Sequence, residues 1–246
     1  MFSVWKRNFL VWKKLALPSM IGNLLDPLFY MLALGYGLGS FIDEINNISY
    51  IAFIATGTVC YGTLNSATFE ILYSTFSRMH VQKSWDAILI TPVRMIDIVN
   101  GEILWATTKS VLSGSAIMLV MFALNILNLK QMFFIFPLII LIGVTFSCMG
   151  FVITSVSKSY DFFMYYFTLV ITPMLLISGV FFPTEKMPII IQKVSEFLPL
   201  KNAIDIVRFI VFDQSSNLLK NFFILILISL VCYILTIKIL RKRLYN

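Results

Sequence analysis

Three ionisable side chains lie inside long apolar stretches of this 246-residue chain: Asp26, Glu70 and Lys109. On insertion scales a charge in such a place costs at least about 2.5 kcal/mol, so each needs a partner or a route to water. Their positions along the apolar stretches put all three near the same membrane surface. This predicts an ion pair between Glu70 and Lys109, which Asp26 could join. Separate snorkelling of each side chain to water is the open alternative.

Residues that could support covalent, metal or nucleotide chemistry are sparse. His80 is the single histidine, which argues against a histidine metal cluster or a serine–histidine relay. Gly57 and Gly62 have the spacing of a phosphate-binding loop, but Thr63 follows them in an apolar stretch where that loop needs Lys. We therefore expect no catalytic residue, metal site or cofactor in this chain. A separate motor or an ion gradient must supply the energy.

The composition shows which medium surrounds these residues. Hydrophobic residues make up 59% of the chain and charged residues only 13%, about half the roughly 25% of a soluble domain. Windows of about 20 apolar residues predict one all-α domain, 1–246, that crosses a membrane several times. The six predicted transmembrane helices are residues 24–41, 50–73, 103–127, 132–156, 162–182 and 218–240.

The distribution of Lys and Arg predicts the orientation. Basic residues gather beside both termini and in the connections after the second and fourth predicted helices, which puts both termini in the cytoplasm. The net charge of +7 requires no nucleic acid, because anionic lipids of the inner leaflet account for it. Three cysteines within apolar stretches provide no disulfide framework.

The N-terminal stretch 2–17 alternates aromatic and basic residues. Trp5 and Trp12 fall on one side of a helix, and Lys6 and Lys13 flank that side. The pattern predicts an amphipathic helix flat on the inner leaflet, with its aromatic rings in the membrane interface and Pro18 ending it. A plain membrane anchor is the alternative reading.

Residues 76–102 form the longest inward-facing polar connection, and residues 84–98 within it show a regular apolar pattern. Trp85, Ile88 and Leu89 recur at helical spacing, which predicts a short helix with an apolar stripe, divided by Pro92. Two readings stay open at this point. The helix either lies on lipid or fits a groove on a cytosolic partner.

Residues 183–210 interrupt the fifth apolar stretch on the opposite side. Pro183, Pro188 and Pro199 each remove a backbone donor and bias the preceding residue away from helix, so no continuous helix passes through. Gly179 and Arg208 bound this broken segment. Such backbone is tolerated near a bilayer only inside protein or beside water, which predicts re-entrant or extracellular short helices.

Seven distinctive blocks run in order along nearly the whole chain. They are WKRNFLVWKKLAL, GNLLDPLFYMLALGYGLG, SYIAFIATG, ATFEILYSTFSRM, WDAILITPVRMIDIVNGEILWATTK, SKSYDFFMYYFTLVITPMLLISGVFFP and FLPLKNAIDIVR. Taken together, these blocks resemble the permease subunits of type-2 ATP-binding-cassette (ABC) exporters. Within these, the chain is most similar to the nodulation protein J family of lipo-chitooligosaccharide exporter permeases.

The resemblance implies a role for each segment. It makes 2–17 an elbow helix, 84–98 a coupling helix that docks on a separate ATPase subunit, and 183–210 a cap on the outer mouth. It also implies two permeases, a homodimer in the simplest case, with two ATPase subunits that hold ATP and Mg²⁺, in a bacterial inner membrane. The expected docking residues are Trp85, Asp86, Ile88, Leu89, Thr91 and Pro92.

The resemblance also implies an amphipathic substrate. In such exporters it passes between permeases, where Tyr30, Tyr36, Phe162, Phe163, Tyr165, Tyr166 and Phe167 could stack on sugars, although lipid-facing aromatics look the same in sequence. The chain favours Ile, Phe, Lys and Asn, which leaves the substrate open among lipids, glycolipids, lipo-oligosaccharides and amphipathic drugs or antibiotics. A gradient-driven carrier would show interrupted helices in both halves of the chain, and here only the C-terminal half does. A lipid transferase would need a nucleophile beside Glu70.

Overall fold

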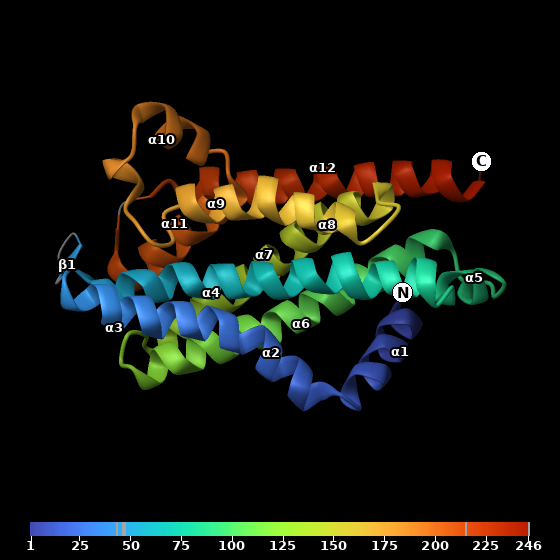
Figure 1. Cartoon of the computed structure of the whole chain (residues 1–246), viewed down its shortest axis with the longest axis horizontal. Helices are drawn as coiled ribbons and strands as arrows, with labels where there is room; N and C mark the ends of the chain where they lie inside the picture. Colours follow the sequence, from blue (N-terminus) through green and yellow to red (C-terminus); the bar gives the residue numbers. More distant parts are fainter. Residues whose placement is uncertain (43, 46–47, 215, 246) are drawn as a thin grey trace.

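The computed structural model describes residues 1–42, 44–45, 48–214 and 216–245, apart from the side chains of 23, 24, 26, 244 and 245. Within this part, long helices run side by side in an elongated bundle (Figure 1). The elements are α1 (Phe2–Lys13), α2 (Ala16–Phe29), η1 (Tyr30–Leu34), α3 (Gly35–Gly37), η2 (Leu38–Ser40), β1 (Glu44–Ile45), β2 (Ile48–Ser49), α4 (Tyr50–Phe69), η3 (Glu70–Thr75), η4 (Ser77–Val81), α5 (Ser84–Leu89), α6 (Met95–Ala123), α7 (Leu129–Val156), α8 (Asp161–Tyr166), η5 (Phe167–Ile171), α9 (Thr172–Ile177), η6 (Thr184–Lys186), α10 (Ile189–Ser195), α11 (Pro199–Phe212) and α12 (Leu218–Tyr245).

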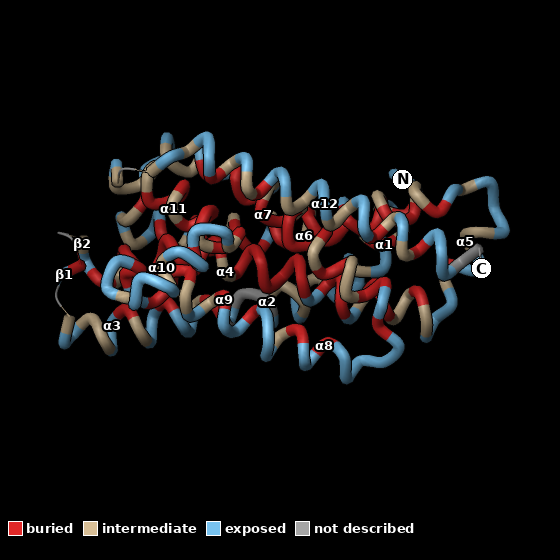
Figure 2. The backbone as a smooth tube through the Cα atoms, turned by 90° about the horizontal axis from the view of Figure 1, so that it is seen from above, coloured by how far each residue is buried: buried red, intermediate tan, exposed pale blue. Residues whose placement is uncertain are grey.

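Helix α4 is the centre of the bundle. Nearly every residue along it is buried, and it packs against α2, α6, α7 and α11 (Figure 2). Because α4 is surrounded by protein, it carries Thr, Ser and Asn on all sides instead of showing one apolar stripe. Helix α12 packs on α7 and α11 at the edge of the bundle. Its outward face carries exposed Leu, Ile and Val side chains, as expected for a surface in contact with lipid.

Four helices of the described part are long and apolar enough to cross a membrane: Ala16–Ser40, Met95–Ala123, Leu129–Val156 and Leu218–Arg243. The helix Asp161–Ile177 is apolar but shorter. The stretch 50–73, expected as a transmembrane helix, forms α4 and most of η3. Its polar residues lower its average hydropathy, so it does not stand among the four.

The two ends of the bundle differ in character. Both chain termini and α5 lie toward one end, and the β1–β2 hairpin, α10 and α11 lie at the other (Figure 1). Throughout, "inner end" denotes the end with α5, and "outer end" the end with α10. The segments expected as elbow and coupling helices, 2–17 and 84–98, lie toward the inner end. The proline-broken segment 183–210 lies at the outer end.

Several element boundaries differ from the sequence-based expectation. The helix expected over 2–17 ends at Lys13, and Pro18 lies in the first turn of α2, where a missing backbone donor leaves no hydrogen bond unmade. The helix expected over 84–98 is only α5, because a turn around Pro92 separates it from α6, which begins at Met95. The fifth helix expected to reach residue 182 ends at Ile177, before Gly179 adopts a positive φ of 83°.

Candidate functional site

The first candidate site is a buried charge network at the inner end. Lys109 on α6 places its Nζ atom 2.9 Å from Oε2 of Glu70 on η3, and the Glu70 side chain is only 3% exposed. The indole Nε1 of Trp105 donates to Oε1 of the same carboxylate at 2.9 Å. Glu70 begins a π-helical turn, a local widening that is frequent at functional sites in helices. The structure thus brings two of the three sequence-predicted ionisable residues together.

Two further residues complete the network, and sequence analysis assigned neither of them to it. Arg78 on η4 donates through Nη2 to Oε2 of Glu102 at 2.6 Å and through Nε to Oε1 at 3.1 Å. The same Nη2 atom reaches Glu70 Oε1 at 2.8 Å. Glu102 is fully buried. This two-pronged geometry is the strong form of an arginine–carboxylate contact.

A sequence signal for these residues did exist. Glu70 and Arg78 are eight residues apart, and Glu102 and Lys109 seven, so each pair falls on one face of a continuous helix. The apolar windows do not reveal this spacing, because residues 78 and 102 fall outside the predicted transmembrane helices. Asp26 belongs to α2, but its side chain is outside the described residues.

The N-terminal helix α1 is attached to this network. Asn8 is buried and donates through Nδ2 to Glu102 Oε2 at 2.9 Å. Gly101 permits the close approach of α1 to α6, because a Cβ atom there would lie 2.7 Å from Cβ of Val4 and 2.8 Å from the carbonyl oxygen of Met1. The charges of Arg78, Glu70, Glu102 and Lys109 therefore join α1, η3, η4 and α6 into one unit.

The aromatic side of α1 contacts α6, an addition to the membrane-interface contact that the sequence predicts. The rings of Trp5 and Trp12 both pack edge-on against Trp105 of α6, and Trp5 Nε1 donates to Thr108 Oγ1 at 3.0 Å. Both Trp5 and Trp12 are half-buried on this face, and the interfacial position of the helix stays a prediction. Lys6 and Lys13 are exposed.

The second candidate site is the tip of the inner end, formed by α5 and the turn after it. Asp86, Thr91 and Pro92 are exposed there, and Ile88 and Leu89 are half-buried. Ile90, which was not among the expected docking residues, is 88% exposed although it is a large apolar residue. Ile90 thus adds an exposed apolar side chain to the half-buried Ile88 and Leu89 at this tip.

Trp85 differs from the other expected docking residues. It is 1% exposed and lies beside Phe151 of α7, with ring centroids 6.1 Å apart. Trp85 therefore anchors α5 to the bundle and is not available to a partner. The helical spacing in the sequence identified the apolar stripe but could not distinguish its buried members from its exposed ones.

The third candidate site is the outer cap. Arg208 of α11 is 6% exposed, and its Nη2 atom donates to the carbonyl oxygens of Gly179 at 2.7 Å and of Phe53 at 3.4 Å. Its guanidinium carbon also lies 3.7 Å from the centroid of the Phe53 ring, a cation–π contact. Arg208 thus ties α11 to α4 and to the chain reversal at Gly179.

The three prolines of the cap have different surroundings. Pro183 is buried directly before η6, and Pro188 is exposed as the N-cap of α10. Pro199 is buried at the first position of α11, where proline favours the start of a helix. The breaks at Pro183 and Pro199 are therefore packed on protein, whereas α10 after Pro188 carries exposed side chains such as Ile189 and Ile190.

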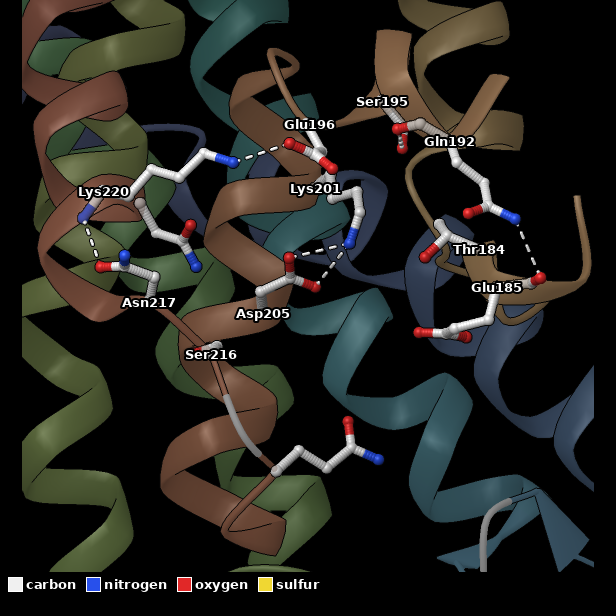
Figure 3. A pocket seen from close by; sticks show the side chains of 12 residues that line it. Thr184, Glu185, Gln192, Ser195, Glu196, Lys201, Asp205, Ser216, Asn217 and Lys220 are labelled. Carbon is white, nitrogen blue, oxygen red and sulfur yellow. Dashed lines mark hydrogen bonds and ion pairs between the residues drawn. The ribbon is translucent and has the colours of Figure 1, made fainter. Parts of the chain in front are cut away.

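A polar pocket of about 320 Å³ opens within this cap (Figure 3). Two ion pairs hold its walls. Lys201 Nζ lies 2.8 Å from Oδ2 of Asp205, and Lys220 Nζ lies 2.8 Å from Oε2 of Glu196. The hydrogen bond from Lys220 holds the pKa of the Glu196 carboxyl below its ordinary value. Gln192, another wall residue, donates to the carbonyl oxygen of Glu185 at 3.0 Å.

The aromatic residues considered for a substrate path do not share one surface. Phe163 and Tyr166 are buried in the core of the chain itself. Tyr36 and Tyr165 are about 60% exposed, at 62% and 59%. The remaining ones are Tyr30 and Phe162, both exposed, and Phe167, which is half-buried.

Among the described residues no group of three or more His, Cys, Asp or Glu side chains could hold a metal ion.

Long apolar helices, buried charges at one end and a broken cap at the other define a multi-pass, all-α membrane protein. The model of the ABC-2 type transporter family matches residues 1–212, and the chain belongs to this family. Nodulation protein J of Rhizobium leguminosarum bv. viciae is 40% identical over 98% of this chain and 94% of its own length. Nodulation protein J of Rhizobium leguminosarum bv. trifolii is 44% identical over 84% of this chain and 79% of its own. The inner membrane transport permease YadH of Escherichia coli is 21% identical over 80% and 77%.

Membership of this family defines the general role of the chain. It is the permease subunit of an ABC exporter, and an ATPase subunit is its partner. The resemblance found in the sequence to nodulation protein J is confirmed by relatives at 36% to 44% identity.

Proposed function

We propose that this permease moves an amphipathic substrate outward across the bacterial inner membrane. The substrate class is a lipid, a glycolipid or a lipo-oligosaccharide. Two copies of the chain form a homodimer, and two cytosolic ATPase subunits bind its inner end. Six helices cross the membrane with both termini in the cytoplasm, and lipid surrounds the dimer. The partner binds ATP and Mg²⁺, and this chain contributes neither a nucleotide site nor a catalytic residue.

The observation that supports an ATPase bound at the inner end is the buried ion pair between the two segments that flank α5, Arg78 before it and Glu102 after it. Arg78 precedes α5 by less than two helical turns, and Glu102 follows the start of α6 by two turns. Their contact at 2.6 Å closes the segment between them into a loop whose two legs cannot separate without breaking a buried ion pair. A push on the exposed turn at Ile90 is therefore passed to η4 and α6 together.

The surface of the chain suits an amphipathic substrate. Exposed apolar side chains cover much of α8, η5 and α9, and the outer cap ends in a pocket with ion-paired and amide walls. The apolar helix surface matches the hydrocarbon part of such a substrate, and the polar pocket matches its hydroxyl-rich part. An ABC efflux permease for drugs or antibiotics is the alternative with the same partner, and an ion-gradient carrier is the alternative without one.

The coupling surface is tested by charge-introducing variants in the complex with the ATPase. Asp86→Lys and Ile90→Asp should lower export several-fold while the protein still inserts, because both residues are exposed and contribute little to packing. The matched control is Ile190→Asp at the outer end, where the side chain is 78% exposed. Normal export by Ile90→Asp, or equal loss in Ile190→Asp, would show that the partner does not bind at α5.

A further inference from the structure

A pocket of about 410 Å³ lies at the inner end beside the charge network, between α1, α2, η4 and α6. Helices α1 and α2 form a V whose apex points away from the bundle (Figure 1). Arg7, Arg78 and Lys109 line the pocket together with Trp12 and Trp105. Its volume is at the lower end of the roughly 300–1,000 Å³ of small-molecule sites, and cations and aromatic rings share its walls.

The charges around this pocket do not cancel. Among the side chains that the structure describes here, Arg7, Arg78 and Lys109 supply three positive charges, whereas Glu70 and Glu102 supply two negative ones. Both carboxylates are occupied by Arg78 and Lys109, so the positive charge of Arg7 is left over. The pocket therefore has the electrostatic character of a site for one negative charge.

Arg7 is the residue that such a ligand would contact. Its Nη2 and Nε atoms both donate to Oδ1 of the neutral Asn8, at 3.0 and 3.3 Å. Among the described residues no carboxylate lies within ion-pair distance of Arg7. Burial lowers the pKa of the Arg7 guanidinium, and the Glu102 carboxylate opposes that shift only in part. A half-buried cation with a neutral partner gains most from an added anion.

The mouth of the pocket identifies the source of that anion. Val11 and Leu15 are among the residues that line it, and they are 64% and 66% exposed. Trp12 Nε1 donates to Ser19 Oγ at 3.0 Å, which fixes the corner between α1 and α2 beside them. A ligand with its phosphate at Arg7 would place its attached chains on this apolar rim. A small soluble anion would leave the rim uncovered.

We propose that this pocket binds the phosphate headgroup of an anionic phospholipid from the leaflet in contact with α1. Arg7 is the principal cation, and the side chains of Val11 and Leu15 contact the acyl chains. The bound lipid closes the V between α1 and α2 and holds α1 on α6. The proposal rests on the proposed inward orientation of the termini and not on the identity of the exported substrate.

The test measures lipid retention by the full chain in complex with its ATPase. The complex is placed in nanodiscs of phosphatidylethanolamine with a minor fraction of phosphatidylglycerol, and the retained lipid is counted by native mass spectrometry. Arg7→Gln should weaken phosphatidylglycerol retention about tenfold or more, the loss of one charge-assisted hydrogen bond. Arg7→Lys should restore most of it. Lys6→Gln, which removes an exposed cation from the neighbouring position of α1, should leave retention unchanged.

Three results would overturn the proposal. They are equal loss in Arg7→Gln and Lys6→Gln, no preference for phosphatidylglycerol over phosphatidylethanolamine, and thermal stabilisation by inorganic phosphate as large as that by phosphatidylglycerol. The third would assign the pocket to a free anion. None of the readouts involves transport, so an exporter that proved to move a drug would leave this result intact, and a failed lipid result would leave the exporter assignment intact.

Discussion

Replacement of Glu102 by Gln tests the buried network at its most enclosed position. The carboxylate accepts from Arg78 twice, at 2.6 and 3.1 Å, and from Asn8 at 2.9 Å, and it is inaccessible to solvent. The substitution keeps the volume but removes the charge, and one oxygen becomes an amide donor. That donor then faces Arg78 or Asn8, both of which also donate.

The expected loss of stability follows from this geometry. Removal of one partner of a buried ion pair costs about 3–5 kcal/mol, because it leaves the other charge uncompensated. Arg78 retains Glu70 at 2.8 Å, so the lower end of this range applies. For a chain of this length about 3 kcal/mol corresponds to a fall in Tm of roughly 6–12 °C.

The assay is thermal unfolding of the purified protein, with Glu196→Gln as the matched control. Glu196 makes the same kind of contact, to Lys220 at 2.8 Å, but the two side chains are 53% and 44% exposed. Solvent screens such a pair, and its loss should stay within about 1 kcal/mol. Equal Tm values for the two variants would refute the reasoning, because burial would then make no difference to the strength of the contact.

Three further predictions concern the same molecule. Glu70→Gln and Lys109→Gln should be non-additive, with a coupling energy of about 1–3 kcal/mol in a double-mutant cycle of unfolding, and additivity within about 0.5 kcal/mol would contradict the pair. Gly179→Ala should lower Tm and reduce export, since φ is +83° and the new Cβ would lie 3.0 Å from Thr184 Cγ2. Gly37→Ala, with open space around its Cα, is its control, and equal effects would reject the strain argument. Trp85→Ala should cost about 3–5 kcal/mol of stability, as expected for a buried anchor, and a wild-type Tm together with lost ATPase docking would show that Trp85 faces the partner instead.

The membrane class and the approximate positions of the long helices α6, α7 and α12 could be predicted from composition and apolar windows, because the bilayer sets the length of an apolar helix. The contact between Glu70 and Lys109 could also be predicted, since two charges at similar depth in neighbouring helices have few other partners. The additional contacts of Glu70 within the network could not be predicted. Arg78 also binds Glu70, so a simple exchange of charges between positions 70 and 109 would place an ammonium group beside a guanidinium.

Other features depended on tertiary contacts that no local pattern encodes. The burial of Trp85 follows from the position of Phe151 on α7, and the protein contacts of Trp5 follow from Gly101, which lets α1 approach α6. Arg208 looked like one more outer charge in the sequence. The chain reversal at Gly179 brings one of its carbonyl acceptors within reach, and α4 supplies the other at Phe53.

The central claim is that this chain is driven from outside by a nucleotide-hydrolysing subunit bound at α5. The most direct measurement reconstitutes the permease in proteoliposomes with a fluorescent short-chain glycolipid, with and without the ATPase partner and ATP. We expect movement against the gradient only when permease, partner and ATP are all present, and its loss in Ile90→Asp. Uphill movement by the permease alone, or driven by an ion gradient in the absence of nucleotide, would contradict the account.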